Sequence, residues 1–229
     1  DDLREERSHS VSLSADLYHT FGKVQTNLLV EGFYTILDDV FALRDMDDAA
    51  DGGKVKERYN GSGATVRGFN VEGRAAFTRW FELQAGVTLQ QSRYKEPEFW
   101  SEDAEVPPVR RMFRTPDAYG YFTASFKPVR NFTADLSGTC TGSMLVQHMA
   151  GSGVGQDVAV STPSFFDMNI RLSYDVRIYK EITMQLYGGV QNLFNAYQKD
   201  FDKGVDRDSG YIYGPSLPRS WFVGAKFSF

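Results

Sequence analysis

Long apolar runs are missing from this sequence, and none approaches the ~18 consecutive apolar residues that a membrane-spanning helix needs. Cysteine is nearly absent as well, and the single Cys140 excludes an internal disulfide framework without fixing the cellular compartment. The three histidines, His9, His19 and His148, are too dispersed to predict a metal site. These absences remove helical membrane proteins, disulfide scaffolds and histidine-rich metal proteins from consideration.

Basic blocks are also missing. The 229 residues carry a net charge of -5, which argues against a nucleic-acid-binding surface. No signal peptide is present, and Asp1-Asp2-Leu3 does not resemble a native start. We therefore expect a fragment of a longer protein, of a length that suits one large all-β unit.

Alternation of apolar and polar residues is what the sequence does contain, and it is clear at the carboxyl terminus. One face would carry Trp221, Val223, Ala225, Phe227 and Phe229, and the other Ser220, Phe222, Gly224, Lys226 and Ser228. A period of two predicts a β-strand. A strand that ends on a terminal aromatic needs a sheet at its edges, as in the transmembrane β-barrels of bacterial outer membranes.

The cleanest alternation runs from Phe166 to Ile178. Its apolar, even-numbered set is Phe166, Met168, Ile170, Leu172, Tyr174, Val176 and Ile178, and the residues between them are polar or charged. An arginine on the lipid face of a barrel strand costs ~2–4 kcal/mol at mid-bilayer. Both arginines of this segment, Arg171 and Arg177, fall on the polar face. We predict that the even-numbered residues face outward, towards lipid.

The connections sort by length. Short turns near residues 21, 79, 129 and 180 alternate with long loops near 49, 106, 155 and 208. Outer-membrane barrels have short periplasmic turns and long extracellular loops. The pattern predicts an all-β, antiparallel meander of about nine long strands forming part of a transmembrane β-barrel, starting at the extracellular side. Single-chain bacterial barrels have even strand numbers, so an odd count implies missing strands.

Three further expectations concern strand and loop boundaries. The second strand is predicted to continue from Val24 to Leu43, followed by an acidic loop from Asp45 to Gly53. Loops are predicted over 96–116, 147–163 and 199–218. The alternative fold is a β-sandwich, whose strands also alternate. Sandwich strands usually have about 5–6 residues, and these segments are roughly twice as long.

Short motifs carry a family resemblance. The segment Val190-Gln-Asn-Leu-Phe-Asn195 with Tyr197, the segment Gly214-Pro-Ser-Leu-Pro-Arg219, and Phe229 resemble the end of TonB-dependent outer-membrane receptors. In that family an Asn-Leu-Phe-Asn or Asn-Leu-Phe-Asp segment precedes the last extracellular loop, and a Pro-Arg pair opens the last strand. The segments at 31–35, 70–72, 114–116 and 144–148 are similar to receptors from Bacteroides-type bacteria.

This resemblance implies a barrel of about 22 strands with a plugged lumen. Residues 1–229 would be the carboxyl-terminal portion of that barrel, with the plug domain and the earlier strands absent. The implied protein is not an enzyme and needs no cofactor. It is an active-transport receptor in the Gram-negative outer membrane for a scarce nutrient such as an iron chelate (a siderophore) or cobalamin. Its implied partners are outer-membrane lipid, the TonB-ExbB-ExbD system through the absent plug region, a small-molecule nutrient complex and a possible surface lipoprotein, with no nucleic acid.

Candidate ligand-binding residues lie in the long loops. Arg110, Arg111 and Arg114 would attract an anionic ligand, because arginine presents a planar fork of donors. The alternative for these arginines is contact with anionic lipid headgroups or simple solvation of the loop. Four loop aromatics would stack on a ligand, or would anchor the barrel at the membrane interface: Phe99, Trp100, Tyr211 and Tyr213.

His148 and Met149, at the rim of another loop, would touch a metal chelate or haem, or would form an ordinary loop segment. Four loop aspartates, Asp200, Asp202, Asp206 and Asp208, resemble a calcium-binding loop. They lack the spaced glycine and closing glutamate of the EF-hand, so no metal site is predicted there.

Two other functions are alternatives to transport by a receptor, a barrel enzyme and a porin. A barrel enzyme would need a nucleophile or paired acids with a positioned histidine. No Gly-x-Ser-x-Gly motif is present, and His148 has no evident triad partner in sequence, although spacing alone does not exclude a spatial triad. A porin is the nearer alternative, and a plug domain upstream of Asp1 would exclude it.

Overall fold

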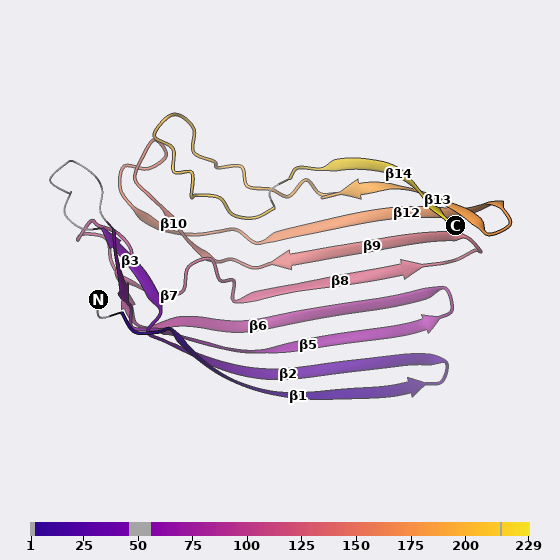
Figure 1. Ribbon diagram of the computed structural model, residues 1–229, viewed down its shortest axis with the longest axis horizontal. Helices are drawn as coiled ribbons and strands as arrows, with labels where there is room; N and C mark the ends of the chain where they lie inside the picture. Colours follow the sequence, from indigo (N-terminus) through magenta and orange to yellow (C-terminus); the bar gives the residue numbers. More distant parts are fainter. Residues whose placement is uncertain (1–2, 46–55, 216) are drawn as a thin grey trace.

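The computed structural model describes residues 3–45, 56–215 and 217–229. Apart from Asp45, the predicted acidic loop from Asp45 to Gly53 lies outside these residues. Within the described ranges no helix is long and apolar enough to cross a membrane. The chain forms one large sheet, with two small hairpins at one of its ends (Figure 1).

Nine strands follow one another across the sheet, and each pairs antiparallel with its neighbour. They are β1 (Arg7–Phe21), β2 (Val24–Asp38), β5 (Ala64–Thr78), β6 (Phe81–Glu98), β8 (Ala118–Phe126), β9 (Phe132–Thr141), β12 (Phe165–Tyr179), β13 (Ile182–Gln191) and β14 (Ser220–Ser228). The predicted antiparallel meander of nine long strands is therefore confirmed.

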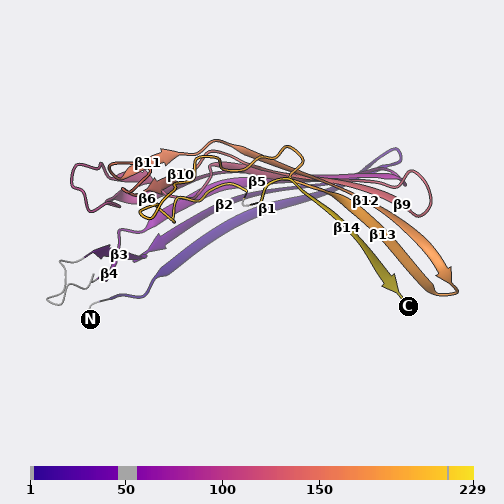
Figure 2. The ribbon, with the colours of Figure 1, turned by 90° about the horizontal axis from the view of Figure 1, so that it is seen from above.

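The sheet is strongly curved (Figure 2). Its outermost strands are β1 and β14, and within the described residues these two strands do not pair with each other. A single curved sheet of this kind excludes the alternative β-sandwich, in which two sheets pack face to face. It has the shape of part of a barrel wall.

The pairing register places the predominantly apolar set of residues of each of the nine strands on one face. Residues directly opposite each other in antiparallel strands share a face. One row that crosses the whole sheet consists of His19, Thr26, Ala75, Leu83, Ala124, Leu136, Ile170, Val190 and Trp221. Because Ile170 belongs to this row, the even-numbered residues of β12 lie on the apolar face. Cys140 is exposed on the same face, opposite Phe166.

The opposite face is polar and carries hydrogen bonds between neighbouring strands. Asn70 of β5 donates to Glu31 of β2 at 2.9 Å and accepts a bond from Thr88 of β6 at 2.8 Å. Near the other side of the sheet, Ser125 donates to Asp135 at 2.6 Å. A wall with one continuous apolar face and one hydrogen-bonded polar face suits a barrel between lipid and an aqueous lumen.

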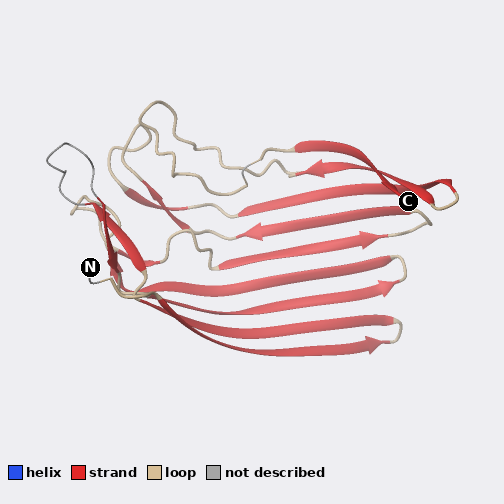
Figure 3. Cartoon of the chain, viewed as in Figure 1, coloured by secondary structure: helices blue, strands red, loops and turns tan. Residues whose placement is uncertain are grey.

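Short and long connections lie at opposite ends of the strands (Figure 3). The turns 22–23, 79–80, 127–131 and 180–181 form what we call the short-turn end. The long connections 39–63, 99–117, 142–164 and 192–219 form the loop end. The predicted alternation of turns and loops is confirmed.

Some predicted boundaries were wrong. The second strand ends at Asp38 rather than Leu43, because Asp39 adopts a left-handed φ of 53° that interrupts the strand. The chain then forms the hairpin of β3 (Phe41–Asp45) and β4 (Lys56–Asn60).

The predicted loops also contain strands. β6 extends to Glu98 and pairs with the short β7 (Val109–Arg111). The connection 142–164, which contains the loop predicted over 147–163, includes a hairpin of β10 (Leu145–His148) and β11 (Val158–Ser161). These strands pair within or beside the loops, so their partners are not visible in the alternation of the long strands.

Candidate ligand-binding loop cluster

Three loops at the loop end, 99–117, 142–164 and 192–219, are held together by hydrogen bonds, and we call them the loop cluster. The first contacts the second through Ser101, whose hydroxyl donates to Asp157 at 2.6 Å. The second contacts the third through Ser152, whose hydroxyl donates to the carbonyl of Lys203 at 2.6 Å. The cluster is therefore one connected body rather than three independent loops.

Arg114 links all three loops. Its backbone N–H donates to the carbonyl of Leu145 at 2.7 Å. Its guanidinium donates to the carbonyls of Ile212 at 2.8 Å and Gly210 at 2.5 Å. A φ of 57° at Arg114 turns the chain here. Arg114 was predicted to attract an anionic ligand. Its guanidinium instead binds backbone carbonyl oxygens and holds the loops together.

A small hydrophobic core lies inside the cluster. Its buried members are Val146, Phe165, Tyr211 and Tyr213, and the two tyrosines are 4% and 6% exposed. Their rings meet edge to face, with centroids 5.3 Å apart. Both predicted ligand-stacking tyrosines are thus packed within the loops themselves.

One carboxylate, that of Asp200, receives both tyrosine hydroxyls. Tyr211 donates to it at 3.0 Å, and Tyr213 donates at 2.6 Å. Burial alone would raise the pKa of Asp200, but the bonds from Tyr213 and Tyr211 outweigh it and lower that pKa. Burial, together with the bond to Asp200, raises the pKa of Tyr213 well above its usual value. The carboxylate is therefore ionised and both phenols neutral at neutral pH.

Gln198 packs against the same core and is only 1% exposed. Its amide nitrogen donates to the carbonyl of Tyr211 at 3.0 Å, and its amide oxygen accepts the N–H of Tyr213 at 2.8 Å. One side chain thus satisfies two backbone groups that would otherwise be buried without partners.

His148 is also built into the cluster. Its ring stacks on Tyr211, with centroids 3.7 Å apart and planes 6° from parallel. Its Nε2 lies 3.0 Å from Asp202 Oδ1, and both side chains are less than a tenth exposed. Burial would raise the pKa of Asp202, yet the backbone N–H of Asp208 and the His148 ring lower it.

The loop aspartates are used as hydrogen-bond acceptors. Asp208 accepts the N–H of Met149 at 2.8 Å and that of Gly210 at 2.7 Å, which orders the third loop against the second. Within the described part of the chain, no group of three or more His, Cys, Asp and Glu side chains is arranged to hold a metal ion.

The remaining predicted residues differ in accessibility. Arg111 pairs with Asp117 at 3.1 Å and donates to the carbonyl of Ser143 at 2.7 Å. Among the described residues, the one ion pair of Arg110 is a long, solvent-exposed contact of 3.7 Å with Glu96. Met149 keeps 37% of its surface exposed. Among the predicted loop arginines, His148, Met149, Tyr211 and Tyr213, the side chains of Arg110 and Met149 therefore remain most available to a ligand.

A cavity of about 330 Å³ opens between the first two loops. Trp100, Glu105 and Pro107 line one side, and Gln156, Asp157 and Ala159 line the other. Trp100 is held there by a bond from its indole N–H to the carbonyl of Pro107 at 3.3 Å. Trp100, one of the loop aromatics predicted to stack on a ligand, lines this cavity, whereas nothing in the spacing of the sequence links it to Asp157.

Solved structures share this fold. The ferric-catecholate import receptor Fiu from E. coli, in its closed form, has a TM-score of 0.65 and 18% identity, covering 98% of this chain and 28% of that one. The copper transporter OprC has a TM-score of 0.62 and 13% identity, covering 100% of this chain and 32% of that one. The ferripyoverdine receptor of Pseudomonas aeruginosa has a TM-score of 0.61 and 12% identity, covering 96% of this chain and 27% of that one.

These identities establish the shared fold alone. The chain spans less than a third of the length of each of these three proteins. No curated protein matches the sequence. The family described as TonB dependent receptor-like, β-barrel matches residues 1–193. The chain accordingly belongs to the TonB-dependent receptor β-barrel family, whose members are integral barrels of the bacterial outer membrane.

Proposed function

We propose that the whole protein actively imports a scarce nutrient across the outer membrane, and that this chain supplies barrel wall and extracellular loops. The match of residues 1–193 to the receptor-barrel family carries the proposal. The polar face of the sheet and the hydrogen-bonded loop cluster support it, because an importer needs an aqueous lumen and ordered loops at its extracellular opening.

The substrate we propose is an iron chelate such as a siderophore, or a corrinoid such as cobalamin. Similar structures include a ferric-catecholate import receptor and a ferripyoverdine receptor. In this chain, Arg110 and Met149 are proposed as direct contacts. Arg114 and the buried aromatic core would hold the loops in the shape that presents them.

The energy for uptake would come from the TonB-ExbB-ExbD system, acting on a plug domain. We propose that the plug and the earlier strands are contributed by residues outside this chain, since it covers only 27–32% of the three receptors compared. A surface lipoprotein that hands over the nutrient, and kinship with receptors from Bacteroides-type bacteria, are part of the same proposal.

The test is uptake of radiolabelled ferric siderophores and cobalamin by cells that express the complete protein, with and without a functional TonB. We expect saturable uptake of one ligand class that disappears without TonB. Uptake that is unsaturable and independent of TonB would support a porin instead. Chemical conversion of the ligand at the cell surface would support a barrel enzyme.

Variants locate the binding surface. Arg110→Ala combined with Met149→Ala should weaken apparent affinity by roughly tenfold, the effect of losing one charged hydrogen bond. The matched control is Lys180→Ala, which removes the same charge at the short-turn end. An equal loss of apparent affinity in both variants would contradict the proposed placement of the ligand.

A further inference from the structure

Positive charge is concentrated at the short-turn end. The four turns, 22–23, 79–80, 127–131 and 180–181, contain five cations and one acid in a chain whose net charge is -5. The cations are Lys23, Arg79, Lys127, Arg130 and Lys180, and the acid is Glu181. Such a reversal of sign confined to one end of the molecule calls for an anionic neighbour at that end.

Three of these cations, Arg79, Lys127 and Arg130, are exposed and form no ion pair within the described residues. They come from two turns that are joined directly, because the N–H of Lys127 donates to the carbonyl of Trp80 at 2.7 Å. The backbones of the β5–β6 and β8–β9 turns are therefore held together, which brings their three cations to one region of the short-turn end.

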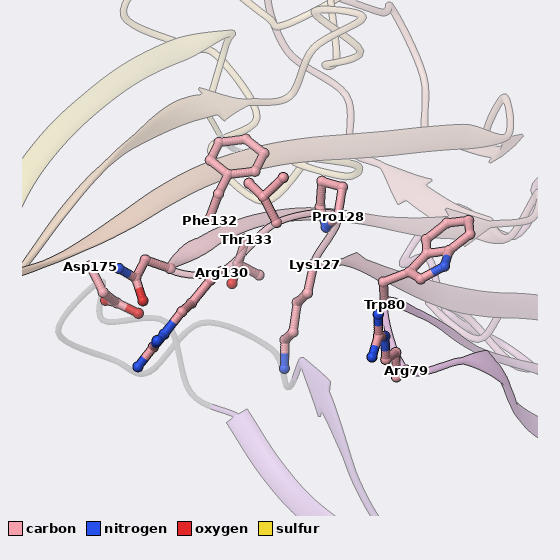
Figure 4. Close-up of a pocket in the computed structure, with 10 residues that line it drawn as sticks. Arg79, Trp80, Lys127, Pro128, Arg130, Phe132, Thr133 and Asp175 are labelled. Atoms are coloured by element: carbon pink, nitrogen blue, oxygen red, sulfur yellow. The ribbon is translucent and has the colours of Figure 1, made fainter.

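The three cations line a single cavity of about 580 Å³ (Figure 4). Its apolar surface comes from Trp80, Pro128, Val129 and Phe132. Asp175 is the one carboxylate in the lining, and its Oδ1 already accepts a bond from Gln185 at 2.9 Å. Three positive charges against one negative charge leave the cavity with a net charge of +2.

An aromatic cluster fixes the depth of this cavity in the membrane. On the apolar face, the rings of Phe77 and Phe81 lie 5.2 Å apart, and those of Phe81 and Phe126 lie 4.4 Å apart. Trp80 adds to it at 6.4 Å from Phe126. Aromatic girdles of barrels sit at the level where hydrocarbon meets headgroups. The neighbouring cations consequently lie at headgroup level.

We propose that this cavity binds the phosphate group of an anionic phospholipid in the periplasmic leaflet. Arg79 and Arg130 offer planar donor forks that match phosphate oxygens, and Lys127 adds a point charge. Because Thr133 and Asp175 of the polar face also line the cavity, the acyl chains would pass around the end of the strands to reach the apolar face beside Phe81 and Phe126. The net positive lining favours phosphatidylglycerol over zwitterionic lipids. This inference needs only the barrel in its membrane and is independent of the nutrient imported.

The experiment measures lipid retention by the complete protein. Protein purified in mixed micelles of phosphatidylglycerol and phosphatidylcholine is analysed by native mass spectrometry for bound lipid. The wild type should retain phosphatidylglycerol preferentially. The triple variant Arg79→Gln, Lys127→Gln, Arg130→Gln should lose that preference by roughly fivefold for each cation.

A matched triple variant at the loop end, Lys199→Gln, Lys203→Gln, Arg207→Gln, removes the same charge and should keep the preference. If the short-turn triple fails to fold, as judged by heat-dependent gel mobility, Lys127→Gln alone replaces it. The proposal is overturned if the wild type shows no preference or if both triples lose it equally. It is also overturned if inorganic phosphate, at matched ionic strength and at concentrations no higher than that of the lipid, displaces the lipid, because the acyl chains would then add nothing to binding.

Discussion

Asn192 shows at the level of one residue why the Asn-Leu-Phe-Asn segment has its sequence. It is 3% exposed and has a φ of 50°, a left-handed conformation that asparagine tolerates better than most residues. Its amide nitrogen donates to the carbonyls of Ala196 and Leu217, at 3.0 and 2.9 Å, and its amide oxygen accepts the N–H of Ala196 at 2.8 Å. One side chain thus closes the turn after β13 and anchors the approach to β14.

Replacing Asn192 by alanine should destabilise the loop end by about 2–4 kcal/mol, because it strands buried backbone groups. The measurement is the temperature at which the folded, heat-modifiable form of the complete protein is lost on a gel. Asn195→Ala is the matched control. Asn195 also has a positive φ, of 55°, but its amide oxygen makes a single bond, to the N–H of Arg219 at 2.9 Å. Equal shifts in the two variants would refute the role assigned to Asn192.

Sequence reasoning at this scale found the right region but not the right roles. Tyr211 and Tyr213 were correctly placed in a long loop, yet their burial depends on Val146 and Phe165, which arrive from other elements. From its spacing in the sequence, Asp200 resembles an aspartate of a calcium-binding loop, whereas in the structure it accepts both tyrosine hydroxyls. A loop side chain becomes core when distant segments pack on it, and local sequence carries no record of that.

At the level of the strand, the alternation of apolar and polar residues was sufficient to predict which residues share a face of the sheet. β12 places Ile170 in an apolar row across the sheet, and Arg171 on the other face donates to Gln185 at 3.1 Å and lies 4.7 Å from the Tyr187 ring. Because side chains alternate along a strand, either the even-numbered or the odd-numbered residues face lipid. The second arrangement would place the arginines in lipid, and its free-energy cost rules it out. The loop hairpins escaped prediction because their strands are only four or five residues long.

The faces of β12 can be tested directly. Spin labels attached at Ile170 and at Arg171, in the complete protein reconstituted into bilayers, should report different surroundings. A label at Ile170 should be accessible to oxygen, which partitions into lipid, and a label at Arg171 should be accessible to a water-soluble relaxation agent. The reverse pattern would show that the polar face points outward, and would overturn the orientation of the wall.

At the level of the whole molecule, the two outer strands govern what the chain can do alone. β1 is exposed along all 15 of its residues, and in β14 Trp221 and Val223 are 76% and 89% exposed. Each strand has one edge without a partner among the described residues. In lipid, every unpaired backbone group on such an edge costs several kcal/mol. In water, long apolar edges pair with other chains instead.

We therefore expect the 229 residues, expressed alone and refolded from urea into detergent or liposomes, to aggregate or insert wrongly. The complete protein, refolded under the same conditions, serves as the control and should give a compact band on an unheated gel that shifts on boiling. The isolated chain should give no such band, because its curved wall presents β1 and β14 with nothing to close against. A stable, SDS-resistant monomer of the isolated chain would mean that these edges find each other, and that nine strands suffice to close a barrel.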